Sequence, residues 1–141
     1  MNREEIKQYI LETYAATSDC PWDKNPNFEV FRHVGSKKWF ALFMDIPQRY
    51  LGLKNDTVSD VMNVKCDPIL IGSLCKEKGI FPAYHMNKNH WISVFADGTV
   101  PPERIKMLIN ISFEATAPKI KRKKNFSKTR QAATCLVSLQ K

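Results

Sequence analysis

No stretch of this 141-residue chain is both long and apolar enough to cross a bilayer. The N-terminal segment carries charged side chains before any apolar run, so it matches neither a signal peptide nor a spanning helix. The four cysteines form no C-x-x-C pair and have no histidine at zinc-finger spacing, which disfavours a disulfide scaffold and a structural zinc site. We therefore expect a cytoplasmic protein without membrane contact, whose cysteines are reduced and mostly buried.

Sequence patterns for catalysis are also missing. The chain has no G-x-S-x-G elbow and no glycine-rich phosphate loop, and it contains only 5 glycines. We predict no enzymatic activity, no catalytic residue and no cofactor, with a ligand or catalytic pocket built on His85 and His90 as an open alternative.

The net charge of +8 is concentrated at one end of the chain. Residues 1–118 hold 14 basic and 14 acidic residues, whereas residues 119–141 hold 8 basic residues and no acid. We expect residues 1–118 to form one domain and residues 119–141 to form a basic tail, either disordered or folded as a short amphipathic helix. The charge of the domain itself gives no general reason to expect nucleic-acid binding.

The hydrophobic pattern predicts an α+β domain. Helices are expected where apolar residues recur at helical spacing, and strands where β-branched and aromatic residues dominate. The predicted order is a helix after Asn2, a loop over 18–27, strands over 28–34, 37–45 and 57–66, a helix over 67–79, one or two strands ending with 91–95, and a helix over 101–117. The simplest packing is two-layer, with the helices on one face of an antiparallel sheet.

Three elements carry specific predictions about which side chains are buried. Strand 37–45 should place Phe40, Leu42 and Met44 on one face and Trp39, Ala41 and Phe43 on the other, with both faces covered. Strand 57–66 should place Val58, Met62, Val64 and Cys66 on one face, and helix 67–79 should bury Ile71, Leu74 and Cys75.

The segment "FPAYHMNKNHWISVF", residues 81–95, gathers two histidines, a lysine and two asparagines before an apolar strand. A metal site would use His85 and His90, perhaps with Asp97, but the histidines are not at i, i+4 spacing and no nearby Cys or Glu completes a ligand set. The pattern therefore predicts no metal site.

Nucleic-acid binding suits this segment better. Lys88 could contact a phosphate, Asn87 and Asn89 could bond a phosphate or a base edge, and Tyr84 or Trp91 could stack on a base. The alternative is structural: Tyr84 and Trp91 would be core aromatics, while Asn87 and His90 bond the backbone of a tight connection. Lys65 would join the cluster if its strand pairs with strand 91–95.

The motifs "PWDKNPNFEVFRH", "KKWFALFM", "VMNVKCDP" and "PAYHMNKNHWISV", followed by "DGTVP", resemble the MmcQ/YjbR family between about Thr13 and Ala117. The family signature is a strand ending in K-C-D-P and then P-[GA]-Y-H-x-N-K-x-H-W. The resemblance implies a CyaY-like, or secretion-chaperone-like, two-layer α+β domain. It also implies DNA binding through paired hairpins that form a double-wing surface.

Two positions depart from the family pattern. Ala83 stands where glycine is usual and reduces backbone freedom beside the motif. Asn89 stands where Arg or Lys is frequent and removes one phosphate contact from the implied surface.

Two hypotheses follow. The first is a nucleic-acid-binding module, most simply for DNA and largely without sequence preference, whose expected contacts are Lys65, His85, Asn87, Lys88, Asn89, His90, Lys121, Arg122, Lys123 and Lys124. The second is a protein- or peptide-binding module that uses a sheet edge or an apolar surface, with the basic tail as a nonspecific appendage.

Overall fold

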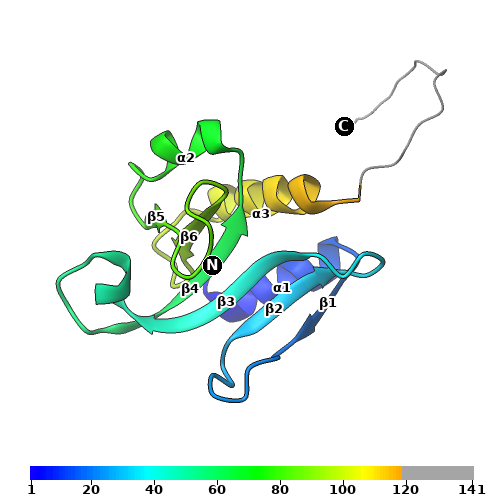
Figure 1. Cartoon of the computed structure of the whole chain (residues 1–141), viewed down its shortest axis with the longest axis horizontal. Coiled ribbons are helices and arrows are strands. Elements are labelled where there is room, and N and C mark those ends of the chain that lie inside the picture. Colours follow the sequence, from blue (N-terminus) through cyan, green and yellow to red (C-terminus); the bar gives the residue numbers. More distant parts are fainter. Residues whose placement is uncertain (119–141) are drawn as a thin grey trace.

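The computed structural model describes residues 1–118, which form a 6-stranded antiparallel sheet with helices on one side (Figure 1). The strands lie in the order β1-β2-β3-β4-β6-β5. In chain order the elements are α1 (Arg3–Thr13), β1 (Ala16–Asp19), β2 (Glu29–His33), β3 (Trp39–Pro47), the 3-10 helix η1 (Gln48–Leu51), β4 (Val58–Lys65), α2 (Pro68–Leu74), β5 (Ile80–Pro82), β6 (Trp91–Phe95) and α3 (Pro102–Thr116). The predicted two-layer α+β class is confirmed. Within residues 1–118 no helix has the length and apolar character needed to span a membrane.

The larger core lies between the sheet and the helices α1 and α3, both behind the sheet in Figure 1. It includes Ile6 and Ile10 from α1, and Leu108 and Ile109 from α3, all of which are fully buried. A capping box begins α1, the helix expected after Asn2: Glu5 N donates to Asn2 Oδ1, and Asn2 N donates to Glu5 Oε1, each at 2.9 Å.

Among residues 1–118, no α-helix lies on the opposite side of the sheet, and we call this side the helix-free face. Its buried residues form a second core cluster: Val30, Leu42, Met44, Ile46, Val61 and Phe95. Aromatic and aliphatic side chains from the connecting segments pack against this cluster, among them Trp22, Leu51, Tyr84 and Met86. Both faces of β3 are therefore covered, as its composition predicted.

An irregularity between β2 and β3 changes which residues of β3 share a face. Phe31 pairs with Ala41, but the next residue, Arg32, pairs with Trp39, so Phe40 is the extra residue of a bulge. As a result Phe40 joins Ala41 in the core under the helices. Trp39 packs on the helix-free face. The predicted alternation was therefore wrong at Trp39 and Phe40. The extra residue of a bulge reverses the order in which side chains alternate between the two faces.

One further strand prediction needs correction. Residues 18–27 were expected to form a loop, but β1 extends through Asp19 and pairs with β2 at the edge of the sheet. On the face of β4 expected to carry Val58, Met62, Val64 and Cys66, the last three are buried in the core under the helices. Val58 is 59% exposed, because β4 begins at this residue.

Helix α2 is shorter than predicted. It begins as expected, with Asp67 Oδ1 accepting from Ile69 N at 2.9 Å, but it ends at Leu74. Of the predicted stripe, Leu74 is buried, while Ile71 and Cys75 are half-buried. Among the cysteines of residues 1–118, Cys66 is buried, Cys75 is half-buried and Cys20 is exposed. The helix or disorder predicted for the tail lies outside the described residues.

Candidate functional site on the helix-free face

A buried pair of polar side chains fixes the start of the motif loop, residues 84–90. Asn63 on β4 and Ser93 on β6 are both fully buried, and Ser93 Oγ donates to Asn63 Oδ1 at 2.6 Å. Asn63 Nδ2 in turn donates to the carbonyl of Tyr84 at 2.8 Å, and the amide of Tyr84 donates to Ser93 Oγ at 3.0 Å. Because a buried unpaired polar group is costly, this network holds Tyr84 in one position against the sheet.

Asn87 organises the rest of the loop. Its side-chain oxygen accepts from the amide of Asn89 at 2.9 Å, and its carbonyl accepts from the amides of His90 at 3.0 Å and Trp91 at 2.9 Å. The carbonyl of His90 accepts from the amide of Cys66 at 2.8 Å, which ties the loop to the end of β4. Asn87 and the backbone of His90 therefore have the structural role given above as the alternative to nucleic-acid contact, because their hydrogen bonds hold the loop together.

The structure places the remaining predicted contacts at the end of the loop and beside it. Lys88, Asn89 and His90 are exposed. The pairing of β4 with β6, which was the condition for Lys65 to join the cluster, is present and sets Lys65 opposite Trp91. The predicted tail contacts Lys121, Arg122, Lys123 and Lys124 lie outside the described residues. Within residues 1–118, no three His, Cys, Asp or Glu side chains gather as a metal site would require.

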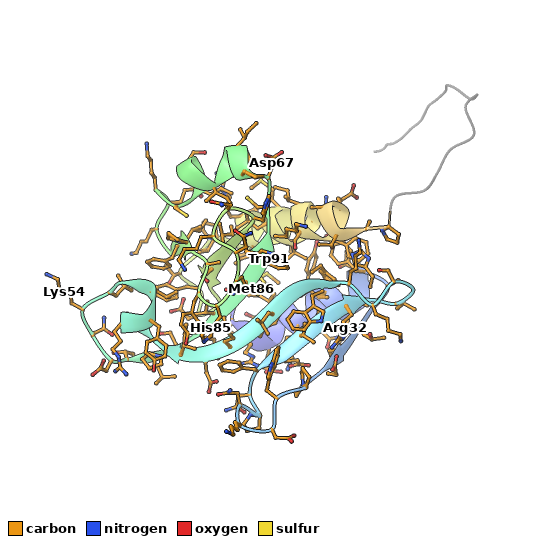
Figure 2. All side chains as sticks on the ribbon, in the orientation of Figure 1. Arg32, Lys54, Asp67, His85, Met86 and Trp91 are labelled. Carbon is orange, nitrogen blue, oxygen red and sulfur yellow. The ribbon has the colours of Figure 1, made fainter. Side chains whose placement is uncertain are left out.

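His85 lies apart from the other predicted residues and lines a pocket. Its backbone has φ +63°, a left-handed conformation that is uncommon for residues other than glycine. Its ring lies 3.9 Å from that of Tyr84, centre to centre. Figure 2 shows His85 and Met86 near the middle of the molecule, in front of the sheet.

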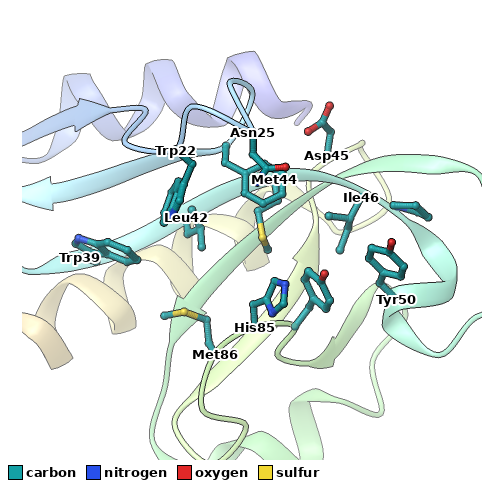
Figure 3. Close-up of a pocket in the computed structure, with 13 residues that line it drawn as sticks. Trp22, Asn25, Trp39, Leu42, Met44, Asp45, Ile46, Tyr50, His85 and Met86 are labelled. Carbon is teal, nitrogen blue, oxygen red and sulfur yellow. The ribbon is translucent and has the colours of Figure 1, made fainter.

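The pocket has a volume of about 690 Å³ and lies on the helix-free face (Figure 3). Its floor is the row of alternate β3 side chains Leu42, Met44 and Ile46. In Figure 3 the side chains of Trp22 and Trp39 stand at one end and Tyr50 at the other, with His85 and Met86 facing the floor. The volume falls within the range typical of small-molecule sites.

The aromatic rings of the pocket form two groups. At one end Trp22 meets Trp39 edge to face, with ring centres 5.5 Å apart, and it meets Phe28 in the same way at 6.2 Å. At the other end Tyr50 and Tyr84 are stacked with ring centres 5.2 Å apart. Burial, with a smaller effect of Tyr50, raises the pKa of the Tyr84 phenol, so this ring stays neutral at physiological pH.

The charges around the pocket are at its ends. No lysine or arginine is among the described residues that line it, and its one carboxylate, Asp45, points away from the floor and accepts from Asn27 Nδ2 at 3.1 Å. The guanidinium of Arg32 lies 5.4 Å from the ring centre of Trp39, and that of Arg49 lies 4.9 Å from the ring centre of Tyr50. The interior is thus uncharged, while a cation stands at each end.

The sequence analysis did not single out most of these residues. Trp22, Trp39 and Tyr50 come from three separate segments, and nothing in their spacing signals that they meet. Asn63 offered a detectable signal, because an amide in the middle of the apolar strand "VMNVK" must find a buried partner.

Fold and site together define a small two-layer α+β domain with an open aromatic pocket on its helix-free face. A family model described as YjbR matches residues 11–115. The chain therefore belongs to the YjbR family, as the resemblance of its motifs indicated.

Relatives from several bacteria support this membership. Uncharacterized protein YyaQ of Bacillus subtilis is 39% identical over 116 residues, which span 82% of this chain and 98% of that protein. A crystal structure of a Pseudomonas syringae protein is 45% identical with a TM-score of 0.80, covering 83% of this chain and 100% of that one. The Deinococcus radiodurans protein DR2400, at 24% identity and a TM-score of 0.60 over 79% of this chain and 75% of that one, shares the fold.

Proposed function

We propose that this protein is a non-catalytic nucleic-acid-binding protein that contacts its ligand with the helix-free face, largely without sequence preference. The observation that supports this function best is the aromatic pocket with an arginine at each end. Proteins that bind nucleic acids combine aromatic rings, which stack on bases, with cations, which contact phosphates.

Lysines at one end of the sheet add to this support. Lys38 precedes β3, Lys65 ends β4 and Lys88 lies shortly before β6. Because these three strands are antiparallel neighbours, the three lysines lie at the same end of the sheet. Within residues 1–118 none of them forms an ion pair, so each is available to a phosphate.

Most of the electrostatic affinity is expected from the tail. Residues 1–118 are neutral overall, and each arginine among them is paired with a carboxylate: Arg3, Arg32, Arg49 and Arg104. Residues 119–141 contribute 8 cations. If six to eight of these contact phosphates, log K falls against log salt with a slope of about −5 to −7, because each contact releases a counterion.

The test is binding of a fluorescent DNA duplex and of one of its single strands to the full chain across a salt series. Replacing Lys121, Arg122, Lys123 and Lys124 by Gln should make the slope less steep by about 3 to 4. Lys88→Gln should weaken binding further, whereas Lys106→Gln, on the outer surface of α3 over the ring of Tyr9, should not. Absence of binding at low salt refutes the function, and equal effects of Lys88→Gln and Lys106→Gln refute the assignment of the face.

Peptide binding is the second candidate function, and the open edge of the sheet favours it. In the described part of the chain, strand β1 pairs only with β2, and three of its four residues are exposed, so its outer edge can accept an added strand. An apolar side chain of such a peptide would suit the uncharged pocket. Binding of this kind should be insensitive to salt and unchanged by Lys88→Gln, which separates it from the first proposal.

A further inference from the structure

We infer that the aromatic pocket receives one unpaired base of a nucleic acid, so that the protein prefers single-stranded DNA or RNA to an intact duplex. This inference rests on the proposed function and names the part of the ligand that enters the site. It follows from the charge, the shape and the edges of the pocket.

The uncharged interior selects the base and excludes the phosphate. Among the described residues, the pocket has no lysine or arginine that could compensate a phosphate, and the carboxylate of Asp45 is directed outside it. A nucleobase is neutral, planar and apolar on both faces, and each base has a face that can stack on an aromatic ring. The rings of Trp22 and Trp39 at one end and of Tyr50 at the other line the pocket and can contact such a base above the aliphatic floor.

Polar groups at the margin can bond the edge of a base. The imidazole of His85, the amide of Asn25 and the hydroxyl of Tyr50 all belong to residues that line the pocket. The left-handed backbone of His85 occurs directly after Tyr84, which the Asn63 and Ser93 network holds in place. Uncommon backbone conformations of this kind concentrate at binding sites, because the surrounding structure must maintain them.

The two arginines are placed to contact the phosphates on either side of the bound base. Arg32 and Arg49 stand at opposite ends of the pocket, and each is held by one carboxylate, Asp19 or Asp56, at 2.8 Å. The Arg49–Asp56 pair is exposed to solvent, and exposed ion pairs are weak, so a phosphate can take over Arg49 at little cost. The side chain of Arg32 is only 25% exposed and bonds Asp19 through two nitrogens, so a phosphate would share Arg32 with Asp19. In a duplex the base would first have to leave its stack, so paired DNA should bind less tightly.

The test uses the full chain and two single strands of equal length and equal charge. One is an oligothymidylate, and the other carries abasic sites at its central positions, so that only the bases differ. The oligothymidylate should bind about 5-fold to 100-fold more tightly, as expected for stacking of one base on aromatic rings. The same strand hybridised to its complement should lose most of this advantage.

Two substitutions in the pocket test whether the base binds there. Tyr50→Ala should reduce binding of the oligothymidylate about 5-fold or more and reduce binding of the abasic strand much less, because the abasic strand loses only the contact between Tyr50 and Arg49. Tyr50 is 44% exposed, so its removal should not prevent folding, and Leu11→Ala, at a 48% exposed residue on α1, is the matched control. Trp22→Leu provides a second test from the other end of the pocket.

The outcomes separate this inference from the function on which it rests. If the two strands bind equally, or if Tyr50→Ala and Trp22→Leu affect both strands alike, the inference is overturned while nucleic-acid binding stands. If neither strand binds at low salt, the proposed function itself fails. A selective loss of oligothymidylate binding in both pocket variants, with the Leu11→Ala control unchanged, supports it.

Discussion

Replacing Asn63 by Leu should destabilise the domain and release the motif loop. Asn63 is fully buried between β3 and β6, and it bonds both Ser93 Oγ and the carbonyl of Tyr84. Leucine has a similar volume but cannot bond either group, so two polar groups lose their partner. Each unpaired buried group costs about 1 to 3 kcal/mol, and after partial relaxation we expect a loss of about 2 to 4 kcal/mol. This is a large part of the roughly 5 to 15 kcal/mol that stabilises a typical domain.

Urea denaturation measures this loss as a lower midpoint with an unchanged slope. Ser93→Ala should cost a similar amount, because it leaves the Asn63 oxygen and the Tyr84 amide without their partner. In the double variant the shared hydrogen bond is lost only once, so the cost should fall short of the sum by about 1 to 2 kcal/mol. The exposed residue Asn110, replaced by Ala, is the control and should change stability by less than about 1 kcal/mol.

Two results would contradict this account. A cost below about 0.5 kcal/mol for Asn63→Leu would show that the Tyr84 carbonyl does not need this partner. Strict additivity of the two substitutions would show that Asn63 and Ser93 act independently.

The remaining predictions concern positions outside the pocket. Burial lowers the pKa of His33, and the charge of Lys38 is a smaller cause of the same shift. The unfolded chain therefore binds a proton at this histidine more readily than the folded chain does. The stability of the domain should be constant above about pH 6.5 and should fall as the pH drops from there towards the folded-state pKa. Melting temperatures from about pH 8 to pH 5 should show a smaller fall in His33→Gln, and equal falls would contradict this cause. Gly79→Ala should cost about 1 to 3 kcal/mol, because its φ is +87° and an added Cβ would lie 2.8 Å from Val100 Cγ2. Gly72→Ala, in the open surface of α2, should instead stabilise by about 0.5 to 1 kcal/mol in the same denaturation assay, and a loss there would contradict the comparison.

Local signals in the sequence predicted most of the secondary structure. The capping box at Asn2 and the N-cap at Asp67 act within a few residues, so they are visible without a fold. The predictions failed where a distant strand decides the outcome. The bulge at Phe40 depends on the pairing of β3 with β2, and β1 forms only because β2 offers it an edge.

The site was predictable only in part. The motif loop was recognisable, and His85 does line the pocket, but Asn87 turned out to bond the loop itself. Trp22 and Tyr50 carried no signal that they belong to one site, because residues 28 positions apart come together only through the folding of the sheet and its connections.

The sequence by itself determined the class of the domain, its family and the unequal distribution of charge, because hydrophobic periodicity, motifs and composition are properties of the chain. The fold alone shows that no helix of residues 1–118 lies on one face of the sheet, and that Trp22, Trp39, Tyr50 and Tyr84 lie there around an uncharged pocket. The physical reason is that a pocket is made by contacts between segments distant in sequence, and such contacts depend on strand order, register and the bulge that turns Trp39 towards that face.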